Sequence, residues 1–255
     1  MNVQIFPACI AATIAVIASY YDLFRGRIIP DKLTIPSIFC GVAFYVILGL
    51  VENNLFLSLY GIFGAIFSFA LAYLLWLTGG WAGGDVKLLT AFGAWVPTYS
   101  PPFFEPLFNS YPLFPLTILF NSAILSLPVV LVYALVQKLR GKGAFYEEKK
   151  ITELREGDIP AEFIYLKNGE VKRERPLLLV HERCDKVLAH PKRAAGLTEE
   201  QIEELKRLAT EGRIENRIKI KKGIPFGPFL AAGLLVGLTV GDLYSFLLRC
   251  LVDVG

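Results

Sequence analysis

The sequence predicts a mainly α-helical membrane protein with six transmembrane helices and a small cytosolic α+β domain inserted between the fifth and the sixth. Two observations predict this class. The 255 residues are 54% hydrophobic, with a mean hydropathy of +0.50, which is too apolar for an ordinary soluble domain of this length. The charged residues, in contrast, are concentrated in a single late segment. We therefore expect three parts: membrane helices one to five in 1–137, a cytosolic domain in 138–222, and the sixth helix in 223–255.

Six apolar stretches are long enough to cross the hydrocarbon layer, which takes about 20 helical residues. They comprise Val3–Tyr21, Leu33–Val51, Leu55–Leu77, Val86 to about Leu107, Leu113–Val136 and Ile224–Val252. Pro97 and Pro101 interrupt the fourth stretch, so its outer part is expected to be irregular, and Pro128 predicts a kink in the fifth. A cleaved signal peptide is the alternative for the first stretch, but a basic n-region and an obvious cleavage site are missing.

Lysine and arginine predict the orientation of these helices. If successive helices alternate in direction, the turns at 22–32 and 78–87 and the long segment 137–223 lie on one side of the membrane. That side holds all of the 26 basic residues except Arg249. Because basic residues mark the cytoplasmic side, we expect a multi-pass protein of the cell membrane whose N-terminus lies outside.

The polar segment between the fifth and sixth stretches has the signals of a small folded domain. Asn168-Gly169 separates two short strand-like runs and is typical of a hairpin turn. Thr198 and Gln201 have capping-box spacing, which predicts the start of a helix that ends at about Ala209. Apolar and polar residues then alternate over 214–220, as in a strand.

Two aspartates lie at the cytoplasmic ends of predicted membrane helices. Asp22 follows the first apolar stretch, and Asp85 ends a glycine-dense loop that begins at Thr78. An ionisable group at membrane depth indicates a functional site. Two facing aspartates share a proton, because like charges at close range resist double ionisation. One carboxylate can then take a proton from water while the other polarises a peptide carbonyl, without a metal, a cofactor or a covalent intermediate.

A structural role explains the same two positions. Asp85 precedes an apolar helix, where the helix dipole and free N–H groups favour a carboxylate. Asp22 could form a surface ion pair with Arg25. Spacing alone leaves both interpretations open. A third aspartate, Asp242, lies in the last apolar stretch, where it could pair with Arg249, and we expect it to take no part in chemistry.

Four residues near the two aspartates are candidates for binding a substrate. Gly83 and Gly84 lack a Cβ atom, so a substrate backbone could approach Asp85 closely. Asp31 could bind a basic peptide, although it also suits the N-cap of the second helix. Lys87 could orient a carboxylate, or it could simply extend its ammonium group to the cytoplasm.

Three motifs carry a resemblance to a known family. They are Gly83-Gly84-Asp85-Val86-Lys87-Leu88, the earlier Asp22 followed by Arg27-Ile28-Ile29-Pro30-Asp31, and Ile224-Pro225-Phe226-Gly227-Pro228-Phe229-Leu230. Together they resemble the type IV prepilin peptidase family, which consists of intramembrane aspartyl peptidases of the GxGD type. The layout is similar to the archaeal branch, which includes preflagellin peptidase. The resemblance covers nearly the whole chain and departs from the motif at Ala82, which stands in place of the first glycine.

This resemblance implies that Asp22 and Asp85 are the catalytic pair of an aspartic endopeptidase. It also implies the substrates: membrane-anchored prepilin-like or archaellin precursors, whose short basic leader would be removed at the cytoplasmic face. The CxxC pairs of the methylating bacterial members are missing, so we expect no methyl transfer. His181 and His190 have no nearby ligand set, and we expect no metal, no cofactor and no nucleic-acid partner; the lipid bilayer is the expected surrounding.

Three alternatives belong to other classes or families. A proton- or cation-coupled transporter would use the same aspartates, but it would place them nearer the bilayer midplane. If the helices only anchor the cytosolic domain to the membrane, replacement of Asp22 and Asp85 would be tolerated. A presenilin-like protease shares the two-aspartate chemistry and a Tyr21-Asp22 motif, but those enzymes have more spans.

Overall fold

The computed structural model describes residues 4–25, 29–78, 81–101, 107–108, 110–141, 143, 145–174, 184–191 and 196–252. Some residues named above lie outside the described ranges: Arg27 and Ile28 of one motif, Gly79 and Gly80 of the glycine-dense loop, and His181. The chain divides into two compact units. The first comprises Met1–Trp76, Trp81–Leu131 and Pro225–Gly255, and the second comprises Leu77–Gly80 and Val132–Ile224.

Helices make up the first unit. In chain order they are α1 (Ile5–Phe24), α2 (Asp31–Val51), α3 (Leu55–Leu77), α4 (Gly83–Trp95), the beginning of α5 (Phe114–Leu139), α7 (Gly227–Thr239) and α8 (Leu243–Val252). Within the described residues, α1, α2, α3 and α5 are long and apolar enough to cross a membrane, and the α7–α8 pair makes a fifth candidate if it is one bent span. These helices confirm a mainly helical protein with apolar spans.

Two of the expected spans take a different form. The fourth helix, α4, has 13 residues and is about 20 Å long, which is less than the hydrocarbon layer of about 30 Å. It ends at Trp95, just before Pro97. The sixth stretch is broken into α7 and α8, which are bent by 72° relative to each other. At the break, Gly241 has a φ of +101°, a backbone conformation that favours glycine.

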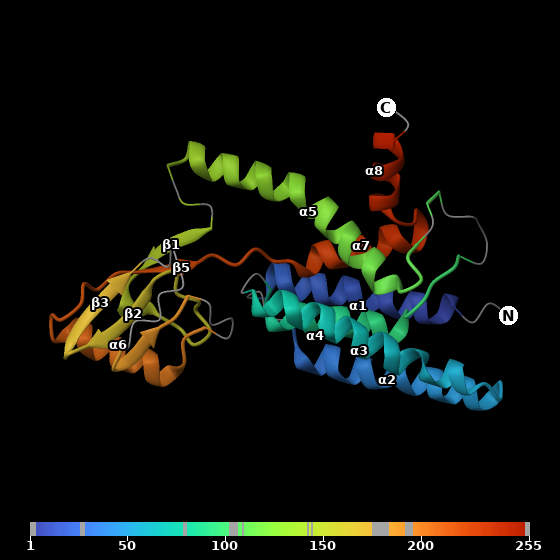
Figure 1. The fold of residues 1–255 in the computed structure, drawn as a ribbon, viewed down its shortest axis with the longest axis horizontal. Helices are drawn as coiled ribbons and strands as arrows, with labels where there is room; N and C mark the ends of the chain where they lie inside the picture. The colour runs from blue at the N-terminus through green and yellow to red at the C-terminus, as the bar shows by residue number, and fades with distance from the viewer. Residues whose placement is uncertain are drawn as a thin grey trace. The chain divides into compact units, whose positions relative to one another are not determined.

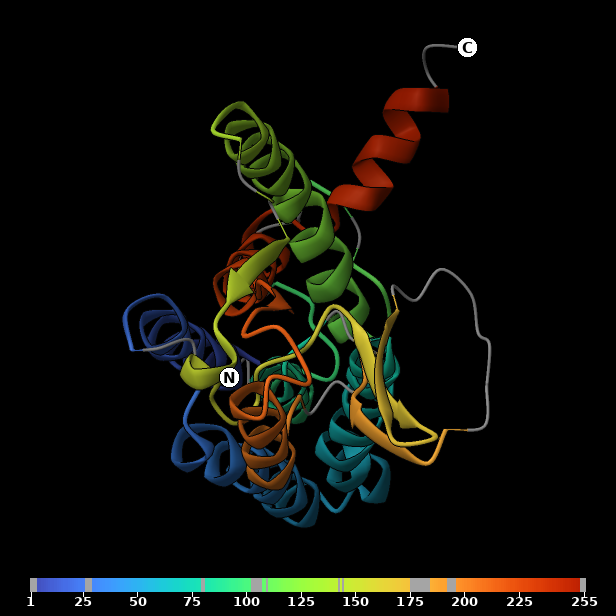
Figure 2. The same cartoon turned by 90° about the vertical axis from the view of Figure 1, so that its left-hand side faces the viewer.

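The short helix α4 lies in the middle of the first unit. It packs against α1, α2 and α7, and Gly64 of α3 lies against Gly93 of α4 so closely that neither could carry a Cβ atom. Figures 1 and 2 show α1 to α4 side by side, with their axes roughly parallel. Nearly every residue of α4 after Gly84 is buried, as expected for a helix that is apolar on all sides.

Large apolar side chains cover the outside of this unit. Examples on α2, α3 and α5 are Phe39, Leu50, Phe63, Ile66 and Leu131, all of which are exposed. A soluble protein rarely exposes so much contiguous apolar surface, whereas a lipid-facing surface requires it. The outer surface therefore agrees with the apolar length of the helices.

The second unit is a small α+β fold. It contains β1 (Tyr146–Lys149), the 3-10 helix η1 (Ile151–Glu153), β2 (Phe163–Lys167), β3 (Glu170–Glu174), β4 (Lys186–Ala189), α6 (Glu199–Thr210) and β5 (Ile218–Lys221). One antiparallel sheet has the order β3-β2-β4, and β1 pairs with β5 in a second. Figure 1 shows α6 beside these strands. One face of α6 packs with them in an apolar core.

The local signals of this unit are confirmed. Asn168 and Gly169 both have positive φ angles, 52° and 79°, in the turn between β2 and β3. Thr198 is the N-cap of α6, and its hydroxyl and the Gln201 side chain complete the expected capping box. The predicted strand over 214–220 is shorter in the structure, because only the residues of β5 pair with β1.

Candidate functional site

Asp22 lies in the last turn of α1, on the buried face of the helix. Ala11, Ala15 and Ala18 precede it on that face at intervals of three and four residues, and such small side chains let neighbouring helices approach closely. Asp22 is only 5% exposed, and its Oδ2 atom accepts a 2.9 Å hydrogen bond from the backbone N–H of Gly227. This burial does not fit a surface ion pair with Arg25.

Asp85 lies in the first turn of α4 and is also 5% exposed. Its Oδ2 atom accepts a 3.2 Å hydrogen bond from the backbone N–H of Ala82, the N-cap residue. Asp85 therefore does cap the start of α4, as the structural interpretation predicted. The capping bond uses the Oδ2 atom, and the Oδ1 atom has no hydrogen-bond partner among the described residues.

The fold brings the two aspartates together. Asp85 follows Gly84, Asp22 accepts a hydrogen bond from Gly227, and both glycines lie beside Ile29, although 63 positions separate the two aspartates in the sequence. Ile29, which is buried, fills the space beside them. A Cβ atom on Gly84 would lie 3.3 Å from Ile29 Cβ, and one on Gly227 would lie 3.3 Å from Ile29 Cδ1. The site is thus a buried pair of carboxylates where the end of α1 meets the starts of α4 and α7.

The two glycines of the predicted substrate site have different surroundings. Gly83 is exposed, and a Cβ atom there would meet no atom within 4 Å. Gly84 is partly buried against Ile29. The structure therefore leaves open space at Gly83, whereas it uses the small size of Gly84 for packing.

Lys87 and Asp31 form an ion pair with each other. Lys87 Nζ lies 2.5 Å from Asp31 Oδ1, and the two side chains are 39% and 59% exposed. The pair joins α4 to the start of α2, a connection that the sequence did not indicate. Asp31 is the first residue of α2, so the expected N-cap position is instead held by Pro30, which has no side-chain capping bond.

Asp242 is fully buried at the break between α7 and α8. Its Oδ2 atom accepts hydrogen bonds from the backbone N–H and the hydroxyl of Ser245, at 3.0 and 2.7 Å. These are the bonds of a helix N-cap residue. Among the described residues no ion pair joins Asp242 to Arg249, so of the roles open to Asp242 the structure shows helix capping and not the pairing considered above.

The sequence analysis did not identify two residues that shape the site. Gly227, which bonds to Asp22, and Ile29, which packs between the glycines, were noted only as members of motifs. The nearest signal was the Pro225-Phe226-Gly227-Pro228 run, where a glycine between two prolines marks a constrained backbone. No periodicity could have shown that this run meets α1.

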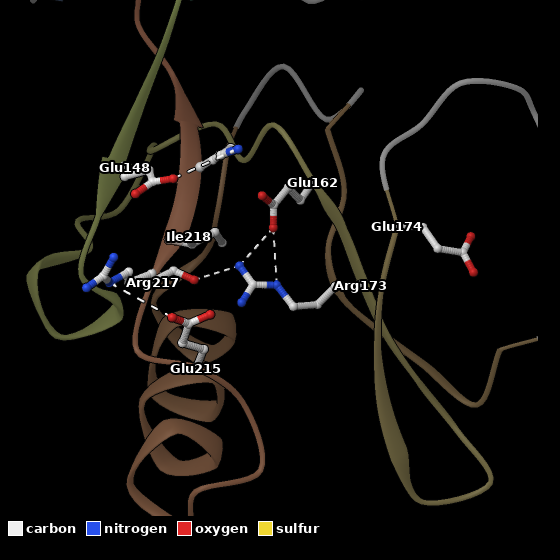
Figure 3. A pocket seen from close by; sticks show the side chains of 8 residues that line it. Glu148, Glu162, Arg173, Glu174, Glu215, Arg217 and Ile218 are labelled. Atoms are coloured by element: carbon white, nitrogen blue, oxygen red, sulfur yellow. Dashed lines mark hydrogen bonds and ion pairs between the residues drawn. The ribbon is translucent and has the colours of Figure 1, made fainter. Parts of the chain in front are cut away.

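The residues that the structure describes hold no group of three or more side chains suited to a metal ion. A separate polar cavity of about 410 Å³ lies in the second unit and is drawn in Figure 3. Its charged side chains largely satisfy one another. Arg173 donates two hydrogen bonds to Glu162 and a third, of 2.6 Å, to the carbonyl of Arg217. The aspartate pair therefore remains the candidate active site.

Two protein-family models match the chain. The model described as "Type IV leader peptidase family" matches residues 9–131, which contain both aspartates. The model described as "Archaeal Peptidase A24 C-terminal Domain" matches residues 121–220, which contain most of the second unit. The two matches together extend over most of the chain.

Curated relatives carry the same kind of name. A prepilin peptidase, EppA, of Methanothermobacter thermautotrophicus is 26% identical, and the alignment covers 98% of each chain. A preflagellin peptidase of Methanocaldococcus jannaschii is 29% identical over 49% of this chain and 55% of its own. A preflagellin peptidase of Methanococcus maripaludis is 31% identical over 46% of this chain and 54% of its own. The chain thus spans about half the length of these two preflagellin peptidases.

Proposed function

Because the chain belongs to the type IV leader peptidase family, in its archaeal prepilin and preflagellin peptidase branch, we propose that Asp22 and Asp85 remove the basic leader from prepilin-like or archaellin precursors. The chain is a peptidase of the aspartic type and a multi-pass membrane protein. The observation that carries the proposal is the meeting of two buried carboxylates at one end of their helices.

The proposed chemistry needs only the two carboxyl groups and water. The ionised carboxylate takes a proton from a water molecule, whose oxygen attacks the carbonyl carbon of the scissile bond. The protonated carboxyl group donates its proton to the carbonyl oxygen. When the tetrahedral intermediate collapses, the C–N bond breaks and the leaving nitrogen takes a proton from the carboxyl group that had acted as base. One hydroxyl of the intermediate returns its proton to the carboxylate that had acted as acid, so the pair again holds one proton. Two buried carboxylates close to each other resist double ionisation, so in this proposal Asp22 and Asp85 hold one proton between them.

The substrate backbone approaches through the open space at Gly83 in this proposal. Gly83 is exposed and two residues from Asp85, while the small size of Gly84 keeps the start of α4 close to Ile29. Asp31 is the more exposed member of its ion pair with Lys87. In this proposal the Asp31 carboxylate binds the basic leader of the precursor. Lys87 holds that carboxylate in position before the precursor binds.

We further propose six crossings of the cell membrane, in which the short α4 and the bent α7–α8 pair each count as one, with the N-terminus outside and 138–222 on the cytoplasmic side. The end of α1 and the starts of α4 and α7 meet at the aspartates, so these ends share one side. The N–H of Phe114 at the start of α5 bonds to the carbonyl of Pro97, just after α4, at 3.0 Å. This bond brings the start of α5 back to the end of α4, which supports a return crossing. The positions of the basic residues support a cytoplasmic location for the aspartates.

A cleavage assay tests this proposal. The substrate is a purified precursor with a short basic leader, reconstituted in liposomes with the wild type or with Asp22→Asn, Asp85→Asn or Asp242→Asn. The first two variants should lose cleavage by about 100- to 10,000-fold, the usual contribution of general acid–base catalysis. Asp242→Asn is the matched control, because asparagine caps helices as well as aspartate does.

The assay separates the alternatives as well. If Asp22→Asn and Asp85→Asn both cleave at the wild-type rate, the two-aspartate mechanism is wrong. If the wild type cleaves no precursor while proton flux depends on both aspartates, the transporter takes its place. The present geometry does not favour transport, because both carboxylates lie at one end of their helices.

A further inference from the structure

An aromatic pair lies next to the two aspartates. The rings of Trp81 and Phe226 have centroids 5.0 Å apart and are tilted by 44°. Both side chains are partly buried and pack against the apolar core of the first unit. Phe229, in the first turn of α7, continues the cluster, with its ring centroid 5.9 Å from that of Phe226. We call Trp81 and Phe226 the aromatic bridge.

The bridge joins the two backbone segments that hold the carboxylates. One ring belongs to the residue before Ala82, whose N–H donates to Asp85 at 3.2 Å. The other belongs to the residue before Gly227, whose N–H donates to Asp22 at 2.9 Å. Each carboxylate is therefore hydrogen-bonded to a peptide N–H whose neighbour carries one ring of the bridge.

Side-chain packing holds these two segments together. Among the described residues, no backbone hydrogen bond joins Trp81 or Ala82 to the segment of Phe226 and Gly227. The contact between the two rings connects the two segments directly, and Ile29 packs beside both Gly84 and Gly227. Since aromatic rings are rigid and prefer defined offsets, the bridge is suited to setting a distance.

We propose that the aromatic bridge is a positioning device that sets the separation of the Asp22 and Asp85 carboxylates. This inference rests on the proposed function, because it concerns the geometry of the same two groups. Without the bridge, the starts of α4 and α7 are free to move apart, and each takes its hydrogen-bonded carboxylate with it. The rate of the chemical step then falls, whereas the binding of the precursor is largely retained.

The test compares Trp81→Ala, Phe226→Ala, the double variant and Trp81→Phe in the liposome cleavage assay. Each alanine variant should lower kcat by about 10- to 100-fold with little change in KM, because a misplacement of about 1 Å costs on the order of 100-fold in rate. The double variant should be no slower than the slower single variant, since either change alone already removes the pair. Trp81→Phe keeps an aromatic partner and should recover most of the lost rate.

Tyr99→Ala is the matched control. Tyr99 pairs with Phe114 at almost the same geometry, 5.2 Å and 47°, beyond the other end of α4, and it packs against the same apolar core. A loss caused by general loosening of that core would appear in Tyr99→Ala too. We expect this variant to cleave the precursor at close to the wild-type kcat.

Each other outcome overturns the inference. A rise in KM at unchanged kcat would show that the aromatic bridge contacts the substrate and does not position the carboxylates. Equal losses in Tyr99→Ala, additive losses in the double variant, or no recovery in Trp81→Phe would reduce the bridge to ordinary packing. Asp22→Asn is measured alongside: cleavage by that variant would refute the proposed function, whereas an inactive Asp22→Asn beside fully active bridge variants would refute only the bridge.

Discussion

Replacement of Gly227 by alanine should damage the site directly, because a methyl group there collides with the Asp22 carboxylate. A Cβ atom on Gly227 would lie 2.9 Å from Asp22 Oδ2 and 3.3 Å from Ile29 Cδ1, whereas ordinary van der Waals contact begins at 3.4 Å. Either Asp22 or the start of α7 must therefore move by about half an ångström. The hydrogen bond from the Gly227 N–H, now 2.9 Å long, lengthens or breaks as a result.

The magnitude follows from that bond. A hydrogen bond to a charged group contributes about 1.5–3 kcal/mol, and each 1.4 kcal/mol corresponds to about tenfold in rate. If the whole bond is lost from the reacting geometry of Asp22, kcat of Gly227→Ala should fall by roughly 10- to 100-fold. The global fold should persist, because the change adds one methyl group at the end of a helix.

Steady-state cleavage of the precursor, combined with thermal unfolding in detergent, measures both effects. Gly223→Ala is the control, since Gly223 is exposed in the same connecting segment and a Cβ atom there would meet nothing within 4 Å. Gly227→Ala cleaving at the wild-type rate would refute the reasoning about Asp22. A comparable loss in Gly223→Ala would show that the segment as a whole, and not the carboxylate contact, is responsible.

Three further predictions concern stability and are checked by thermal unfolding of the full chain. Lys87→Gln removes the exposed ion pair with Asp31 and should cost less than about 1 kcal/mol; a loss well above that would mean the pair is essential to the joint between α2 and α4. Gly93→Ala should cost about 1–3 kcal/mol through overpacking, because its Cβ atom would collide with Ser68 Oγ on α3, and an unchanged melting temperature would contradict the close packing. Thr198→Ala removes the N-cap hydroxyl of α6 and should destabilise the second unit by about 1 kcal/mol, with faster proteolysis of that unit as the readout; Thr198→Ser should be close to neutral.

Local features were the ones that the sequence predicted best. The apolar stretches predicted α1, α2, α3 and α5 nearly to their ends, because the length of an uninterrupted apolar run decides whether a helix can cross lipid. The Asn168-Gly169 turn and the Thr198 capping box were equally direct, since both depend on residues that are neighbours in the chain.

The candidate aspartates were also evident from the sequence, but their environment was not. Asp22 and Asp85 stood out because carboxylates are expensive beside apolar helices. Asp31 and Lys87 were considered separately as substrate contacts, whereas the structure pairs them with each other. Such a pair depends on how α2 and α4 pack, and no property of either segment alone determines that packing.

By itself, the sequence determined which segments are apolar, where helices begin and which carboxylates are out of place. Only the tertiary structure decided that α4 stops after 13 residues, that α7 and α8 bend by 72°, and that Gly227 meets Asp22 across 205 positions of sequence. The physical reason is that hydropathy and capping depend on neighbouring residues. The close approaches at Ile29, Gly84 and Gly227 arise only when the faces of separate helices fit together.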